Sequence, residues 1–297
     1  MQEDSALLLK KWVDRGDVLA DDEIQTLLKQ SELMQRLSAD IKARPDTFAG
    51  LRAYEWRLLE LSHIPYVNRL EKVRAWLHLL MERSSIPEGF SLEGTRNTVV
   101  ACHTSMITSI LIRMMPEERE KIDAGVDWIL RYQSVSRGEV CAWDGTDLFT
   151  RWGGCMHSTP CYHGVVKAMV TLTEYKKQFG SLPGLEEKLA RGLEYILEHQ
   201  VYKRLSNGEP IEPNIILNFY PYPYRTNLIE SLGVLKANGR MSDPRCADAI
   251  ALLKQKQRKD GFWQADASFM KSAWVDFDLS KRPGMWITYV IQQLLND

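Results

Sequence analysis

The segment AGVDWILRYQ (residues 124–133) decides the fold, because it aligns with KVRAWLHLLM (72–81), RGLEYILEHQ (191–200) and DAIALLKQKQ (248–257). One large apolar side chain falls in register in all four segments, namely Trp76, Trp128, Tyr195 and Leu252. Successive segments are 52, 67 and 57 residues apart. Each has apolar residues at i, i+3 and i+4 with charges between them, which predicts an amphipathic helix. A period of this size indicates a helical repeat.

A second, less polar set of helices is predicted between these segments, at about 97–115, 160–178, 226–238 and 283–296. A helix that is apolar on most sides is usually buried on most sides. Residues 21–43 and 48–62 predict a further pair upstream. We therefore expect an all-α chain that alternates amphipathic outer helices with buried inner ones, and no β-sheet beyond short pairings in loops.

About five such hairpins, closed into a ring, would shield all the inner helices. A superhelical solenoid would need polar capping repeats, whereas the last helix, MWITYVIQQLL (285–295), is apolar. The expectation is thus a single α/α-toroid domain over residues 1–297. Residues 71–297 are its repeat core, and residues 1–70 are a first hairpin or an extension.

The predicted connections are unequal in length. Inner-to-outer connections are short, and outer-to-inner connections are long, at 134–159, 201–225 and 258–282. In a ring of antiparallel hairpins the long loops fall on one rim, together with the N-termini of the inner helices. Because long loops on a rigid scaffold often carry function, we expect the site at this rim.

Composition excludes several classes of protein. With 38 basic and 39 acidic residues the net charge is -1, so nothing favours nucleic acid as a partner. No apolar run approaches the roughly 20 residues of a membrane span. The first residues place acids before a short apolar stretch, the wrong order for a secretory signal. Five cysteines without regular spacing favour a reducing cytoplasm, with free thiols or a metal site rather than disulfides.

The segment QRKDGFW (257–263) resembles the QW motif of squalene–hopene and oxidosqualene cyclases. In that motif Gln257 would close the outer helix, Gly261 would make the turn, and Trp263 would pack back on the helix. Residues from about 120 to 295 also resemble bacterial proteins with prenyltransferase and squalene-oxidase repeats, through WGGCMHSTPCYHGVVKAM (152–169), YRTNLIESL (224–232) and WVDFDLSKRPGMWIT (274–288). The resemblance implies the α/α-toroid of terpenoid cyclases and protein prenyltransferases.

The chain also departs from these families. It has no Asp-x-Asp-Asp motif, with which squalene–hopene cyclases protonate their substrate, and no Asp-x-Cys pair of the kind that binds zinc in protein prenyltransferases. Neither reaction therefore transfers directly.

The stretch CMHSTPCYH places Cys155, His157, Cys161 and His163 within nine residues. Thiolate and imidazole are zinc ligands, and three protein ligands with an open position make a catalytic site. We thus consider Cys155, His157 and Cys161 as metal ligands and His163 as a catalytic residue. The alternative is that Cys161 packs as a small apolar residue and the histidines cap a helix or line the cavity.

Two acids and several arginines precede the inner helices. Asp276 and Asp278 would bind Mg²⁺ or act as acid and base, and the alternative is that they are turn and cap residues. Arg151, Arg225 and Arg282 would add bidentate contacts to the helix N-termini and so hold a diphosphate. The alternative is that the arginines pair with loop acids, such as Asp144, Asp147, Glu209 and Glu212.

Aromatic residues are dense in the long loops and would wall an isoprenoid cavity, above all Trp152, Tyr220, Tyr222, Trp274 and Trp286. The alternative is ordinary packing between the loops and the ring. His103 lies on the stripe of an inner helix, so we consider it as a catalytic residue that reaches the cavity.

Three functions follow as hypotheses. The first is a cytoplasmic enzyme that binds a small apolar or isoprenoid ligand, including an isoprenoid diphosphate, in a central cavity and performs prenyl transfer or cyclisation, with Zn²⁺ or Mg²⁺ as its metal. The second is a non-catalytic toroid that binds a lipid or a peptide. The third is a carbohydrate-active toroid, because Asp/Glu pairs with aromatic platforms suit glycoside hydrolases and polysaccharide lyases.

Overall fold

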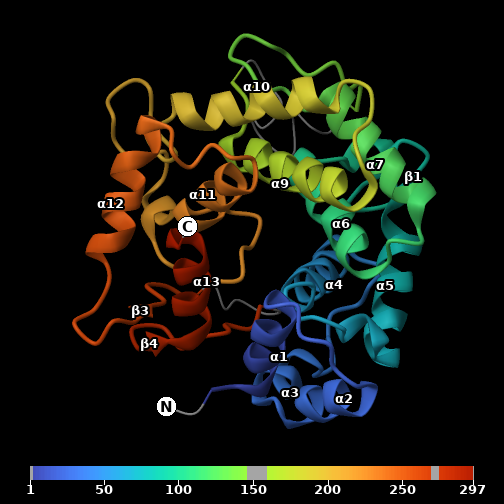
Figure 1. Cartoon of the computed structure of the whole chain (residues 1–297). Coiled ribbons are helices and arrows are strands. Elements are labelled where there is room, and N and C mark those ends of the chain that lie inside the picture. The colour runs from blue at the N-terminus through green and yellow to red at the C-terminus, as the bar shows by residue number, and fades with distance from the viewer. Residues whose placement is uncertain (1–2, 146–158, 269–273, 297) are drawn as a thin grey trace.

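A computed structural model describes residues 3–145, 159–268 and 274–296, and these residues are mostly helical (Figure 1). The α-helices are α1 (Ser5–Asp14), α2 (Asp21–Gln30), α3 (Glu32–Leu37), α4 (Phe48–Leu61), α5 (Glu71–Ser84), α6 (Ala101–Met114), α7 (Arg119–Tyr132), α9 (Tyr162–Phe179), α10 (Leu185–Glu198), α11 (Leu228–Ala237), α12 (Ala247–Gln255) and α13 (Met285–Leu295). Single 3-10 turns cover Val67–Arg69, Arg96–Thr98, Pro213–Ile216 and Pro244–Cys246.

Strands in the described part of the chain are limited to two antiparallel pairs within loops. One pair joins β1 (Ser85–Ile86) to β2 (Gly89–Phe90), and the other joins β3 (Trp263–Gln264) to β4 (Pro283–Gly284). The expectation of an all-α chain with only short loop pairings is confirmed for these residues.

Both predicted sets of helices are present. The four aligned segments fall on α5, α7, α10 and α12, where Trp76, Trp128 and Tyr195 are buried and Leu252 is half-buried. The four less polar segments fall on α6, α9, α11 and α13. The four less polar helices lie within about four residues of their predicted bounds, whereas α7 and α10 begin at Arg119 and Leu185, before the aligned segments 124–133 and 191–200.

The N-terminal region differs from the prediction in two places. The predicted helix over 21–43 divides at Ser31, whose hydroxyl accepts from the backbone N–H of Met34 and so starts α3. The helix α1 was not predicted. It begins at Asp4, whose carboxylate accepts from Ala6 and also from Leu33, which ties α1 to α3.

The helices pack in a regular succession. Along the chain α4 contacts α6, α6 contacts α9, α9 contacts α11, and α11 contacts α13. Figure 1 shows these helices toward the middle and α5, α7, α10 and α12 at the periphery. Each peripheral helix packs on its neighbour in this inner group, as α7 does on α6 and α10 on α9.

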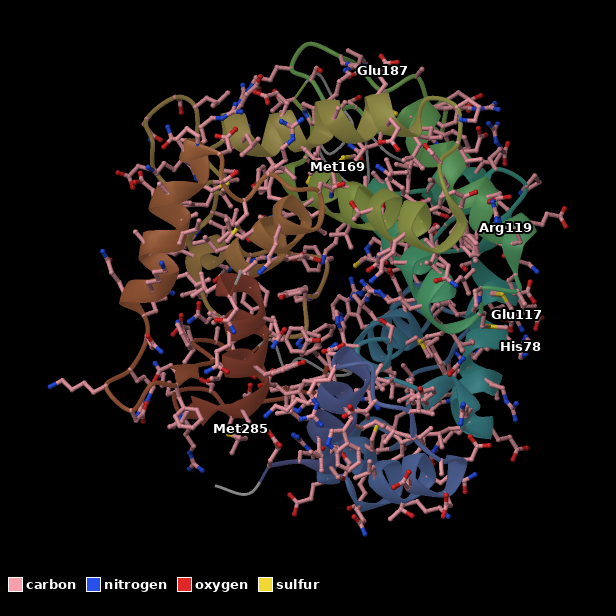
Figure 2. The ribbon with its side chains drawn as sticks, viewed as in Figure 1. His78, Glu117, Arg119, Met169, Glu187 and Met285 are labelled. Carbon is pink, nitrogen blue, oxygen red and sulfur yellow. The ribbon has the colours of Figure 1, made fainter. Side chains whose placement is uncertain are left out.

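One hydrophobic cluster runs through the whole described chain, from Leu7 in α1 to Leu294 in α13. The first 70 residues therefore share a core with the repeats. Figure 2 illustrates the two kinds of position: Met169 lies buried where α9 meets α10, whereas His78 and Glu187 lie at the exposed edge of outer helices.

The QW-like segment has the local geometry that its motif predicts. The side-chain amide of Gln257 donates to the carbonyl of Gly261 at 2.9 Å, and Gly261 has a φ of 81°. The indole N–H of Trp263 donates to the carbonyl of Leu253 at 2.8 Å, so the ring packs back on the end of α12. Positive φ favours glycine, which explains its place in this turn.

Candidate functional site

A cavity of about 400 Å³ lies between α1, α6, α9, α11 and the segment that follows α4. Its polar lining consists of Lys10, His63, Arg113, Glu174, Tyr222 and Glu230, besides two hydroxyl groups. The lining comes mainly from the carboxyl-terminal parts of α6 and α9, from α11 along its whole length, and from Tyr222 in the loop before α11. The sequence predicts a site at the rim of long loops and inner-helix N-termini, and of the lining Tyr222, Ile229 and Glu230 belong to that part of the chain.

Arg113 is the charged residue of α6, one position before the helix ends. Its Nε and Nη2 atoms donate to one oxygen of Glu174 on α9, at 2.9 and 2.5 Å, and its Nη1 atom donates to the hydroxyl of Ser62 at 3.0 Å. Burial alone would lower the pKa of Arg113, but the carboxylate of Glu174 raises it overall. The guanidinium is therefore a permanent positive charge at the wall of the cavity.

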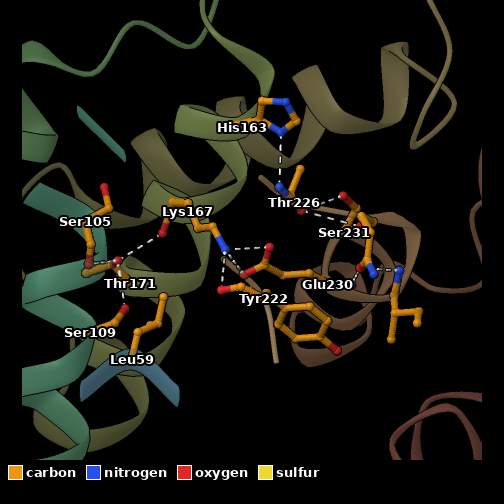
Figure 3. Close-up of polar contacts among 12 residues, drawn as sticks. Leu59, Ser105, Ser109, His163, Lys167, Thr171, Tyr222, Thr226, Glu230 and Ser231 are labelled. Atoms are coloured by element: carbon orange, nitrogen blue, oxygen red, sulfur yellow. Dashed lines mark hydrogen bonds and ion pairs between the residues drawn. The ribbon is translucent and has the colours of Figure 1, made fainter. Parts of the chain in front are cut away.

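Lys167 and Glu230 form a second ion pair, deeper than the first (Figure 3). The ammonium of Lys167 on α9 lies 2.6 and 2.8 Å from the two carboxylate oxygens of Glu230 on α11. The two side chains are only 4% and 7% exposed. Burial lowers the pKa of Lys167, although Glu230 opposes the shift. Both residues also line a hollow of about 10 Å³ that shares His63, Arg113 and Tyr222 with the cavity.

The helical spacing explains why these charges meet. His163, Lys167, Val170 and Glu174 are three or four residues apart, so they lie on one face of α9. Figure 3 shows the same face held to its neighbours by Thr171, whose hydroxyl bonds Ser109 and the carbonyl of Ser105 on α6. The polar face of α9 is thus directed into the interior rather than to solvent.

His63 and Tyr222 complete the polar lining. The His63 ring lies 5.9 Å from the ring of Tyr222, edge to face. Burial, reinforced by the charge of Arg113, holds the pKa of His63 well below its ordinary value, so this imidazole is neutral at pH 7. The Nη1 atom of Arg113 lies 3.5 Å from Nε2 of His63, and because a guanidinium only donates, Nε2 is the nitrogen that accepts.

The sequence analysis singled out none of Arg113, Lys167, Glu174 and Glu230. A signal was nevertheless present in three of them. Arg113 follows the apolar run ILI, Lys167 interrupts VVKAMV, and Glu230 interrupts LIESL. An isolated charge inside the apolar stretch of a buried helix must find a partner or a ligand.

Most of the predicted aromatic wall packs on itself. The rings of Tyr220 and Trp286 stack at 6.0 Å, and Phe277 meets them edge-on at 5.6 and 4.8 Å. Trp274 is buried against Trp56 at 6.4 Å. Of the predicted aromatics that the structure describes, only Tyr222 lines the cavity. The packing alternative therefore describes Tyr220, Trp274 and Trp286.

Asp278 is a capping residue. Its two carboxylate oxygens accept from the backbone N–H groups of Trp286 and Ile287, at 3.2 and 2.7 Å, at the start of α13. Burial raises its pKa, and these bonds oppose the shift. Asp276 lies in the same loop, where its charge contributes to the raised pKa of Asp278 and of Glu60. Neither aspartate lines the cavity.

The two histidines considered as catalytic are held by carboxylates. Nδ1 of His103 lies 2.6 Å from a carboxylate oxygen of Glu55, and both side chains are buried between α6 and α4. Nδ1 of His163 accepts from the backbone N–H of Thr226 at 3.1 Å, so its proton is on Nε2, which faces Glu212 at 3.3 Å. His103 and His163 do not line the cavity.

The arginines of the long-loop rim differ from one another. Arg225 donates to the hydroxyl of Tyr224 at 2.8 Å and pairs with Glu212 at 3.3 Å. This pair agrees with the alternative that the arginines bind acids of the loops. Burial alone would raise the pKa of Glu212, but His163 and Arg225 lower it overall. Arg282 is exposed and follows Lys281, which has a φ of 62°.

Arg151, Trp152, Cys155 and His157 lie outside the described residues, as does Asp147. The remaining residue of the predicted zinc site, Cys161, is half-buried at the N-cap of α9. Both nitrogens of its neighbour His163 are already engaged. The described residues contain no group of three or more His, Cys, Asp or Glu side chains placed to hold a metal ion. No disulfide joins any of the four described cysteines.

Within residues 3–145, 159–268 and 274–296, every helix is too short or too polar to cross a membrane. Comparisons of the chain with models of protein families, with curated proteins and with solved structures found no match.

Proposed function

We propose that the helices form an α/α-toroid and that the space inside the ring binds a small molecule. Three observations support the toroid. Inner helices contact one another in chain order from α4 to α13, an outer helix packs on each of α4, α6, α9 and α11, and the QW-like turn closes α12 as its motif predicts. The backbone N–H of Val275, in the loop before α13, donates to Glu60 on α4, and the hydroxyl of Tyr289 on α13 donates to Asp14 on α1. Both contacts link the last inner helix to the N-terminal helices.

The ligand proposed is a small molecule with an anionic head and an apolar body. The observation that carries this proposal is the position of Arg113, whose guanidinium lines the same cavity as the apolar side chains Val170, Ile229, Val234 and Ala237. Lys10, which pairs with Asp14 at 2.9 Å, also lines the cavity at the α1 side. A volume of about 400 Å³ lies in the usual range for small-molecule sites, roughly 300–1,000 Å³.

The existing ion pairs leave room for an anion. An arginine has five N–H donors, and Glu174 and Ser62 accept three bonds from Arg113. A fourth N–H, on Nη1, is directed to Nε2 of His63 at 3.5 Å, so one donor on Nη2 remains for a phosphate or carboxylate oxygen. Glu230 is neutralised by Lys167 behind the cavity, so it does not repel an anion as a lone carboxylate would.

An isoprenoid diphosphate combines the two chemical parts that this lining matches. The proposal moves its anionic head from Arg225 to Arg113, because Arg113 lines the cavity and Arg225 does not. Binding is the activity proposed, because Asp276, Asp278, His103 and His163 do not line the cavity and supply no acid or base to it.

The test is a calorimetric titration of the protein with farnesyl diphosphate, farnesol and inorganic pyrophosphate. Wild-type protein is expected to bind farnesyl diphosphate more tightly than either of its parts. The double variant Arg113→Gln, Glu174→Gln removes both charges together, so no buried carboxylate is left without a partner. We expect it to weaken binding at least about tenfold, as the loss of charge-assisted hydrogen bonds predicts.

The matched control is Arg225→Gln, which removes an arginine from the long-loop rim and leaves the cavity intact. Unchanged binding by this control supports the cavity as the site. If Arg225→Gln weakens binding and the double variant does not, the ligand lies at the rim and the cavity proposal is wrong. Failure of wild-type protein to bind farnesyl diphosphate would remove the isoprenoid diphosphate as the ligand.

A further inference from the structure

A second cavity, of about 530 Å³, lies between the first half of α4 and the segment of residues 39–43. Four alanines, Ala39, Ala43, Ala49 and Ala53, contribute to its walls, and their small side chains leave the space open. It is separate from the first cavity. The two linings have no residue in common.

Arg52 is held between two aromatic rings of α4. Its guanidinium lies 5.2 Å from the ring centre of Phe48 and 4.8 Å from that of Trp56, the residues four positions before and after it on α4. Stacking on two rings restricts the side chain before any ligand arrives. No acidic side chain of the described chain lies within ion-pair distance of Arg52.

The other charges at this cavity are mostly neutralised. Arg57 pairs with Glu60 at 3.3 Å, and Asp40 pairs with Lys72 at 2.5 Å. Lys42, which is exposed, adds a second positive charge without an acidic partner in the described chain. The lining therefore carries a local excess of positive charge beside apolar surface.

Trp56 presents a further unsatisfied donor. Its indole nitrogen is buried and has no hydrogen-bond partner among the described residues. The ring is stacked on Tyr224 at 6.3 Å and lies against Arg52, so its position is well defined. The indole nitrogens of Trp128 and Trp286 are buried without a partner in the same way, so this feature of Trp56 does not by itself indicate a ligand.

We propose that this cavity is a second binding site, which holds a phosphate or carboxylate group on a small apolar molecule through the fork of Arg52, beside the ring of Trp56. Arginine matches the two oxygens of such anions in a planar, bidentate geometry. The apolar part of the molecule packs on the alanines and Ile41. The proposal is independent of the first cavity and of the function proposed for it.

The test uses 1-naphthyl phosphate, 1-naphthoate and the neutral 1-naphthol as probes. Two readouts are taken from the full chain: calorimetric affinity, and the indole N–H signal of Trp56 in a ¹H–¹⁵N spectrum, assigned with Trp56→Phe. Wild-type protein is expected to bind both anions and to shift the Trp56 signal. Arg52→Gln is expected to weaken both anions at least about tenfold and to abolish the shift, with naphthol unchanged.

Arg52→Lys separates charge from geometry, because it keeps the charge and loses the fork. We expect it to weaken the phosphate probe less than Arg52→Gln does. Arg44→Gln is the matched control, since Arg44 pairs with Asp46 on the adjoining exposed segment and does not line the cavity. The double variant of Arg113 and Glu174 should leave the Trp56 shift intact, so the two cavities are tested separately.

Three results would overturn the proposal. One is an unchanged Trp56 signal at saturating concentrations of both anions. Another is equal affinity of wild-type protein and Arg52→Gln for them. The third is an equal shift with 1-naphthol, which would show an apolar cavity without anion recognition. Preference between phosphate and carboxylate in the wild-type titrations then identifies which anion the site takes.

Discussion

At the scale of single residues, Lys167 and Glu230 place two opposite charges in the interior. Removing a charge from water carries a large free-energy penalty, and a buried partner offsets much of it only while both charges are present. The pair therefore favours one arrangement of α9 against α11, without being a net source of stability. Surface pairs such as Lys176 with Glu186 are 44% and 56% exposed and contribute little.

A double-mutant cycle checks this account. Lys167→Met leaves the carboxylate of Glu230 buried alone and is expected to lower the free energy of unfolding by about 3–5 kcal/mol, and Glu230→Leu should do the same for Lys167. The double variant is expected to recover most of that loss, because no buried charge remains. Urea denaturation measures all four proteins, with Lys176→Met as the surface control. A double variant as unstable as the sum of the two single ones would contradict the account.

At the scale of elements, small residues set how closely outer and inner helices approach. A methyl group on Gly125 of α7 would lie 2.2 Å from the hydroxyl oxygen of Thr108 on α6. Thr108 is buried and its hydroxyl donates to the carbonyl of Thr104, so it has little freedom to move. Gly233 of α11 is different, because a methyl group there would meet nothing within 4 Å.

Because their surroundings differ, we expect replacement by alanine to have opposite effects on stability at Gly125 and at Gly233. Gly125→Ala is expected to destabilise the protein by about 1–3 kcal/mol, because overpacking exceeds the gain in helix propensity. Gly233→Ala should raise the free energy of unfolding by up to about 1 kcal/mol, since alanine favours the helix at no steric cost. Thermal and urea unfolding measure both. Restoration of stability by Thr108→Ala in the Gly125→Ala background would identify the contact as the cause, and its failure would point elsewhere.

At the scale of the whole molecule, contacts between residues far apart in sequence hold the C-terminal region to the N-terminal helices. The hydroxyl of Tyr289 on α13 donates to Asp14 on α1 at 2.7 Å. In the loop before α13, the backbone N–H of Val275 donates to the buried carboxylate of Glu60 on α4. These bonds connect residues that local periodicity does not relate.

Tyr289→Phe tests the first of these contacts. Loss of the hydrogen bond to Asp14 is expected to lower the free energy of unfolding by about 1 kcal/mol. The control is Tyr132→Phe, because Tyr132 packs by its ring against Trp128 and Trp143. Chemical denaturation compares the two. Equal losses in both variants would mean that the Tyr289 hydroxyl does not hold α1 to α13.

The sequence by itself determined the helices and their alternation. Trp76, Trp128 and Tyr195 recur at equivalent places because each outer helix buries one stripe, and that stripe repeats with the 3.6-residue period of a helix. The turn after α12 could also be predicted from the sequence, because it depends on local features. Gly261 adopts a positive φ, and Trp263 packs on the end of the helix. The start of α3 at Ser31 and the helix α1 were missed, because a side-chain cap decided the first and a short apolar run concealed the second.

The tertiary structure alone decided which charges meet. Arg113 and Glu174 are 61 positions apart, and Lys167 and Glu230 are 63 apart, so no local pattern relates the partners. Conversely, the sequence predicted that Tyr220 and Trp286 line a cavity. In the structure their two rings stack on each other. The periodicity of a helix tells which side of it is buried. Whether that side meets another side chain or an open cavity depends on how several helices pack together, and that depends on residues distant in the chain.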